Sequence, residues 1–139
     1  MAKQKQESEY DVFMSASHRD EGWLQEAIEY YEQALAIARE IGDRNGESIH
    51  LSNLAEAHKE LGETRLAREL LEQSLDVTRE MGHRQREADV LSNLSEVCEL
   101  IGDKPGAAAC LRDALLIWGE LRSPRADEAR KRLEELEGK

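Results

Sequence analysis

One stretch of the sequence occurs twice, forty residues apart, and this repeat limits the possible folds more than any other feature. Residues 41–54 read IGDRNGESIHLSNL, and residues 81–94 read MGHRQREADVLSNL. The same offset relates Gly62 to Gly102 and Ala67 to Ala107. Self-similarity at a fixed period in this range is typical of arrays in which each repeat is one supersecondary unit that stacks on its neighbours.

Each repeat carries the apolar spacing of two amphipathic helices. Apolar residues recur at i, i+3 and i+4, as at Leu24, Ala27 and Ile28, while glutamate and glutamine fill the other face. The glycine that follows each stripe suits the left-handed conformation that ends a helix. We therefore predict helices over residues 23–41, 44–61, 64–81, 84–101, 104–121 and 124–137. A shorter helix is predicted to begin near residue 9 and to end at a break over residues 20–22.

Side chains that can cap a helix N-terminus stand just before, or at the first residue of, four of these segments. Asp43, Thr64 and Asp103 can each accept a hydrogen bond from the free N–H groups of the following turn. Ser123 precedes Pro124, whose missing N–H costs nothing in a first helical turn. We predict all four as N-caps.

These elements predict an all-α fold, a right-handed α-solenoid of three antiparallel helix pairs plus a C-terminal capping helix. The connections are short, as antiparallel neighbours require. The predicted repeats cover residues 9–42, 43–82 and 83–122, and the capping helix covers residues 124–137. Residues 1–8 are polar and predicted to be disordered, so that residues 9–139 form a single domain. Trp118 is the large residue best placed to pack under the capping helix.

The formal net charge of −11 restricts the classes of partner. An acidic surface repels phosphate groups, which argues against nucleic acids and anionic membrane surfaces. The N-terminus lacks the apolar segment of a secretory signal, and no apolar run reaches the ~20 residues that span a bilayer. The cytoplasm is therefore the predicted location. Cys98 and Cys110 fall at apolar positions, which predicts reduced, buried thiols.

The repeated positions also carry a family resemblance. The second repeat has Leu51, Leu54, Ala55, His58, Gly62, Ala67, Leu71 and Ser74, and the third has Leu91, Leu94, Ser95, Cys98, Gly102, Ala107, Leu111 and Ala114. This frame resembles the tetratricopeptide repeat. Its 40-residue period resembles the long-helix subclass of kinesin light chains, polarity adaptors and bacterial regulators. The first repeat fits less well, because Asp11, Met14, Ser15 and His18 occupy the matching places. The resemblance implies a mode of binding rather than a particular ligand.

The resemblance also implies a binding face. In related long-repeat proteins an asparagine of the first helix faces a concave groove and hydrogen-bonds the backbone of a bound peptide, and the matching positions here are Asn53 and Asn93. A primary amide offers two donors and one acceptor, which suits a peptide unit whatever its side chain. The alternative is that each asparagine only bonds a neighbouring helix. Nearby positions complete the predicted site: Ile49, Ser52, Glu56 and Lys59 in one repeat, and Asp89, Ser92, Glu96 and Glu99 in the next.

The charges on this face predict the character of the ligand. Glu56 and Glu96 stand one turn from the asparagines and predict a neutral to basic peptide. The alternative for these glutamates is an ordinary solvated helix face. Arg44 and Glu47 also recur forty residues later, and their spacing of three predicts an intrahelical pair with a structural role between repeats.

The predicted function is a protein-interaction module or adaptor that binds a peptide segment of a partner protein in its groove. No arrangement of nucleophile, base and acid stands out, so we predict no enzymatic activity. The histidines lack metal-ligand spacing, so we predict no metal and no cofactor. The alternative is an excised or structural segment of a larger regulatory repeat protein, without a ligand of its own. A monomer is favoured, with self-association through Tyr10, Phe13 and Met14 of the first helix as the alternative.

Overall fold

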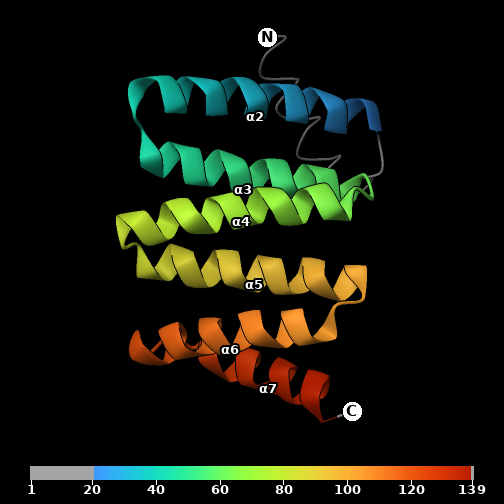
Figure 1. Cartoon of the computed structure of the whole chain (residues 1–139), viewed down its shortest axis with the longest axis vertical. Coiled ribbons are helices and arrows are strands. Elements are labelled where there is room, and N and C mark those ends of the chain that lie inside the picture. Colours follow the sequence, from blue (N-terminus) through green and yellow to red (C-terminus); the bar gives the residue numbers. More distant parts are fainter. Residues whose placement is uncertain (1–20, 139) are drawn as a thin grey trace, which may run out of the picture.

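The structure, a computed structural model, describes residues 21–138, and six consecutive α-helices account for nearly all of them. Each helix packs against the next along the stack (Figure 1). The all-α solenoid predicted from the repeat is confirmed, while the predicted helix near residue 9 and the predicted disorder of residues 1–8 lie outside the described residues. The helices are α2 (Glu21–Ile41), α3 (Arg44–Glu60), α4 (Thr64–Met81), α5 (Arg84–Ile101), α6 (Lys104–Glu120) and α7 (Arg125–Glu137).

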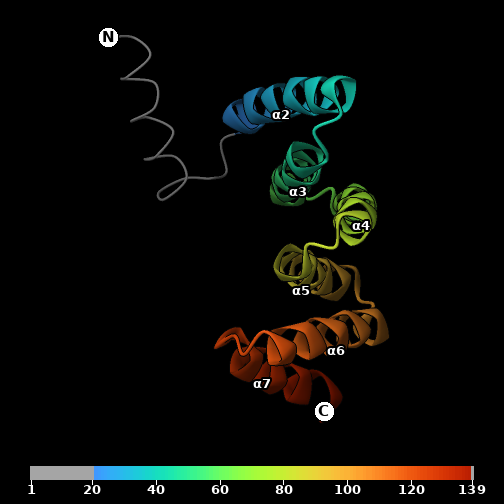
Figure 2. The ribbon, with the colours of Figure 1, turned by 90° about the vertical axis from the view of Figure 1, so that its left-hand side faces the viewer.

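The helices alternate between two sides of the stack. Figure 2 shows α3 and α5 along one side and α4 and α6 along the other. The most extensive packing joins α3 to α4 and α5 to α6, which are the pairs that the forty-residue period predicts. The side formed by α3 and α5 carries the residues predicted to bind a ligand.

The core is built from equivalent residues of successive repeats. Leu51 and Leu91, forty positions apart, are 0% and 2% exposed. Trp118 is buried in the same apolar cluster as Ala126 and Leu133 of α7, so its predicted place under the capping helix is confirmed. The apolar spacing of α4 predicts seven inward positions, Leu66, Ala67, Leu70, Leu71, Ser74, Leu75 and Thr78. Five of them are buried and Leu70 is half-buried, but Leu66 is 39% exposed, and its predicted burial was wrong. Leu66 directly precedes the buried Ala67, and one residue turns the side chain about 100° around the helix.

Left-handed glycines follow the ends of α2, α3, α4 and α5. Gly42, Gly62, Gly82 and Gly102 have φ between 72° and 94°, a region that residues with a Cβ avoid. The predicted break over residues 20–22 was wrong for its last part, because α2 begins at Glu21 and includes Gly22. Glycine costs little there, since the first turn needs no intrahelical N–H bonds.

Two of the four predicted N-caps have the predicted geometry. The Asp43 and Asp103 carboxylates accept hydrogen bonds at 2.9 Å from the N–H groups three residues later. The prediction for Thr64 was wrong: α4 begins at Thr64, and the preceding Glu63 takes the cap position without a side-chain bond. Ser123 stands one residue too early to be the cap of α7, although its hydroxyl accepts a bond from the Arg125 N–H at 3.2 Å.

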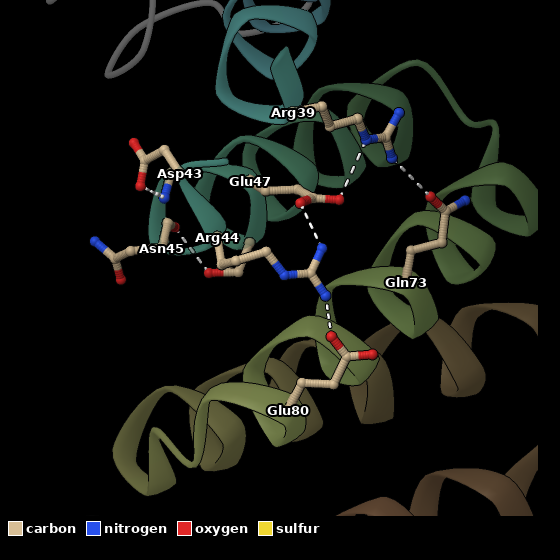
Figure 3. Close-up of polar contacts among 9 residues, drawn as sticks. Arg39, Asp43, Arg44, Asn45, Glu47, Gln73 and Glu80 are labelled. Atoms are coloured by element: carbon tan, nitrogen blue, oxygen red, sulfur yellow. Dashed lines mark hydrogen bonds and ion pairs between the residues drawn. The ribbon is translucent and has the colours of Figure 1, made fainter. Parts of the chain in front are cut away.

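A cluster of arginine and glutamate side chains joins the first repeat to the second, as Figure 3 shows. The Glu47 carboxylate is buried and accepts hydrogen bonds from Arg39 Nε at 3.2 Å and from an Arg44 Nη at 2.8 Å. Arg44 also pairs with Glu80 of α4. We call these four residues the first clamp. It connects the end of α2 with the start of α3 and the end of α4.

The cluster recurs forty residues later as a second clamp. Glu87 is 7% exposed and accepts hydrogen bonds from Arg79 at 3.0 Å and from Arg84 at 3.2 Å. Arg84 also donates to Glu120 of α6 at 2.6 Å. The predicted intrahelical pairs are therefore confirmed, and Arg39 and Arg79 extend them to the preceding helix.

The two cysteines are free thiols in the third repeat. Cys98 is buried and Cys110 is half-buried. Desolvation is the main cause that raises the pKa of Cys110 to about 12, with the neighbouring Cys98 as the next contribution. In an unfolded chain a cysteine ionises near pH 8.5. Because the pKa of Cys110 is higher in the folded protein, the protonated thiol contributes to the stability of the folded state at neutral pH. This contribution is lost as the pH rises from about 8.5 toward 12.

We expect iodoacetamide to alkylate Cys110 slowly in the folded protein at pH 8, because the thiolate is the reacting species and folding suppresses it. Mass spectrometry of native and urea-unfolded samples measures the two rates. The unfolded chain should react at least about a hundredfold faster, since a pKa near 12 reduces the thiolate fraction by more than that factor. Equal rates would contradict a desolvated thiol.

Candidate peptide-binding groove

Four adjoining hollows run along α2, α3, α5 and α7 on the side of the stack where the predicted site residues lie. Their volumes are about 260 Å³ between α2 and α3, 10 Å³ between α3 and α5, and 480 and 520 Å³ between α5 and α7. Neighbouring hollows share lining residues, namely Glu56, Lys59, Glu96 and Arg132. We call this continuous depression the groove.

Asn53 lies at the α2 end of the groove, above an apolar floor. The hollow there is lined by Leu24, Ala27 and Tyr31 of α2 together with Asn53 and Ala57 of α3. Burial is the larger cause that raises the pKa of Tyr31, and the neighbouring Tyr30 adds to it. The tyrosine is therefore neutral at physiological pH, and this end of the groove combines apolar and amide surface with the carboxylates of Glu56 and Glu60.

The narrow centre of the groove brings four predicted residues together from two repeats. Ser52, Glu56 and Lys59 of α3 meet Asn93 of α5. Ser52 has an internal partner, since its hydroxyl lies 3.0 Å from that of Ser74. Asn93 is exposed. Neither asparagine side chain forms a hydrogen bond with another residue of the range 21–138, so a bond to a neighbouring helix is not seen in this part of the chain.

Lys59 reduces the negative charge that Glu56 and Glu96 were predicted to give to the groove. Its ammonium group lies 3.2 Å from the Glu56 carboxylate and 3.5 Å from that of Glu96. Burial opposes the charge on Lys59, but the two carboxylates outweigh it and raise the pKa of this lysine. Lys59 therefore bridges two repeats across the groove. The contact with Glu96 spans thirty-seven positions, which helical spacing does not reveal.

The C-terminal end of the groove is closed by cations of α7. Ser92 and Glu96 line the hollow of about 520 Å³ with Arg125 and Arg132. Arg132 pairs with Glu99, and Arg125 pairs with Asp89 at 2.9 Å. Both predicted acidic residues thus have an internal counter-ion. Asp89 and Ile49 line none of the four hollows.

Two of the histidines in the described part of the chain have other polar contacts. His58 Nδ1 lies 2.7 Å from a Glu63 carboxylate oxygen, and His83 caps α5 by accepting the Arg86 N–H at 3.2 Å. Among residues 21–138, no three histidine, cysteine or acidic side chains come close enough together to hold a metal ion. Over the same residues, no helix combines the length and the apolar character that crossing a membrane requires.

Stacked helix pairs with a groove along their first helices define a class of repeat scaffolds that bind other proteins. The family model described as tetratricopeptide repeat matches residues 9–80. The chain belongs to the tetratricopeptide repeat family, whose members mediate protein–protein interactions. No curated protein matches the chain.

Solved structures of other proteins have the same fold. The crystal structure of BtubC (BKLC) from P. vanneervenii has a TM-score of 0.76 and 22% sequence identity. The similarity covers 91% of this chain and 50% of that one. Kinesin light chain repeats of Podosopora anserina, described as nearly identical TPR-like repeats, have a TM-score of 0.71 and 21% identity, with 86% of this chain and 60% of that chain covered. The chain thus spans half to three fifths of the length of these structures, and the similarity concerns the fold alone.

Proposed function

We propose that the chain is a protein-interaction module that binds an extended peptide segment along the groove. The amides of Asn53 and Asn93 carry this proposal, because they line adjoining hollows and have no hydrogen-bond partner within residues 21–138. One side-chain amide can donate to a peptide carbonyl and accept from a peptide N–H at once. Two amides in successive repeats can therefore hold an extended backbone without regard to its sequence.

The charges along the groove favour a neutral to basic peptide. Five carboxylates and three cations line the four hollows. Lys59 offsets part of the charge of Glu56 and Glu96, so the acidic excess is modest. A peptide with one or two basic residues gains attraction there, whereas an acidic peptide is repelled. The hollow beside Asn53 has an apolar floor and accommodates an apolar side chain of the same peptide.

Replacing both asparagines tests this function. Peptides selected from a displayed random library on the wild-type protein supply the ligands, and fluorescence anisotropy measures their affinity. We expect Asn53→Ala combined with Asn93→Ala to weaken binding by roughly thirtyfold, because each lost amide pairing is worth about 1 kcal/mol. The matched control is Gln25→Ala combined with Gln85→Ala, which removes two exposed amides that line none of the four hollows.

The control double variant should bind like the wild type, and circular dichroism should show equal helicity for all three proteins. Selected peptides that bind both double variants with wild-type affinity would place the site elsewhere. A selection that yields no peptide would favour the alternative of a structural segment without a ligand of its own. The proposal assigns the chain no catalytic step.

A further inference from the structure

Leu100 is an exposed leucine inside the groove. It lies near the end of α5, is 62% exposed, and lines the hollow of about 480 Å³ between α5 and α7. Among the exposed large apolar side chains of residues 21–138, only Leu100 lines one of the four hollows. Single leucines on a protein surface are ordinary, but a leucine that lines a hollow offers apolar surface that a bound side chain can cover.

The fold does not require leucine at this place. Forty positions earlier, the equivalent residue of α3 is Glu60, which is exposed. The next residue of α5, Ile101, packs against the apolar core cluster, whereas Leu100 is not part of it. Neither the forty-residue pattern nor the core therefore accounts for an apolar side chain at position 100.

The charged residues around Leu100 neutralise one another. Lys59 Nζ lies 3.5 Å from a Glu96 carboxylate oxygen, and Arg132 pairs with Glu99. These four residues complete the lining of the hollow. One pair joins α3 to α5, and the other joins α5 to α7. The hollow therefore has no net charge, and each of its charged groups already has a counter-ion.

A leucine among paired charges favours an apolar ligand group over a charged one. A charged side chain in this hollow would lose water and would have to displace one member of an existing pair to find a counter-ion. An apolar side chain has no such cost and gains by covering Leu100. The methylene groups of Lys59 and Arg132 add to the apolar surface of the same lining. An apolar centre within a polar rim is typical of the positions that dominate binding energy at interfaces.

We propose that Leu100 anchors the bound peptide by packing against one large apolar side chain, such as leucine, methionine or an aromatic residue, in the hollow between α5 and α7. The inference rests on the proposed function, because it requires a peptide that lies along the groove. The hollow shares Lys59 with the narrow centre, where Asn93 lies, so one peptide reaches both. The asparagines then hold the peptide backbone whatever its sequence, and Leu100 selects one of its side chains.

A double-mutant cycle tests this contact on the full chain. The probes are the fluorescein-labelled peptides selected on the wild-type protein, and variants of them in which each large apolar residue in turn is alanine. We expect Leu100→Ala to weaken the parent peptide about tenfold, which corresponds to losing the burial of about two methylene groups. One alanine peptide should lose about tenfold on the wild type. Leu100→Ala should weaken that peptide by less than about twofold more, because the contact is already absent.

Leu116→Ala is the matched control, because Leu116 is 64% exposed on α6 and lines none of the four hollows. It should leave the affinity for the parent peptide unchanged, and circular dichroism should show equal helicity for all variants. Leu100→Glu adds a second readout, since it introduces the residue type that α3 has at Glu60. A new selection on this variant should yield peptides with lysine or arginine in place of the apolar residue.

The proposal is overturned if no residue of the selected peptides couples to Leu100, if the peptides share no large apolar residue, or if selection on Leu100→Glu yields the same apolar residue. The groove itself stands in these cases when Asn53→Ala combined with Asn93→Ala still weakens binding. If the asparagine double variant binds like the wild type, or if the first selection yields no peptide, the proposed function fails and the role of Leu100 fails with it.

Discussion

Replacing Leu91 by alanine is expected to lower the free energy of unfolding by about 3 kcal/mol. Leu91 is 2% exposed and belongs to the apolar cluster that joins α4, α5, α6 and α7. Alanine would leave a cavity that the surrounding helices fill only in part, because their packing against one another limits how far they can move. Urea denaturation followed by circular dichroism at 222 nm measures the loss.

The matched control is Leu116→Ala on α6, where the leucine is 64% exposed. It should change stability by less than about 0.5 kcal/mol, as is usual for surface positions. Leu51→Ala should cost as much as Leu91→Ala, because Leu51 holds the same register one repeat earlier and is 0% exposed. A loss for Leu91→Ala no larger than that of the control would contradict the assigned core.

The second clamp should contribute nearly as much as a core leucine. Glu87→Gln is expected to lower the free energy of unfolding by about 2 kcal/mol, the range for hydrogen bonds to a charged group. The carboxylate is 7% exposed and accepts from both Arg79 and Arg84. Glutamine keeps the shape of the side chain but removes its charge. Its NH₂ group is a hydrogen-bond donor and therefore cannot accept from the guanidinium group that it faces. Glu47→Gln should behave alike, because the first clamp has the same geometry.

Glu135→Gln provides the control for charge alone. Glu135 is exposed on α7 and forms no ion pair with the described residues, so its replacement should leave stability within about 0.5 kcal/mol. Both variants reduce the net negative charge by one. A loss in Glu87→Gln that only matches Glu135→Gln would show that the clamp holds the repeats together no better than a surface charge.

Local rules predicted most of the fold because the decisive signals recur at one period. Gly82 and Gly102 end their helices in the left-handed conformation, and Asp103 caps its helix, as their residue types indicate. The errors arose where two neighbouring residues compete for one role. Thr64 has the better capping side chain, yet the turn after Gly62 places Glu63 at the cap. Leu66 is apolar, but Ala67 occupies the inward position.

The groove was harder to predict from the sequence, because its charges depend on contacts between repeats. The pairs of Lys59 with Glu96 and of Arg132 with Glu99 join helices thirty-three or more positions apart. Spacing rules cover only one turn of one helix. The two clamps could have been predicted from the sequence, since Arg39 and Arg79 recur at the same offset as Arg44 and Arg84.

The central claim is that the groove binds a peptide through the amides of Asn53 and Asn93, and the side-chain NH₂ resonances of these residues test it most directly. The measurement is a ¹⁵N–¹H correlation spectrum of the protein titrated with a library-selected peptide, with both side-chain signals assigned by Asn→Ala substitution. We predict that these two signals shift and gain protection from exchange with water, while the side-chain signals of Gln25 and Gln85 do not move. Shifts confined to α4 and α6, with both asparagine signals unchanged at saturation, would contradict the claim.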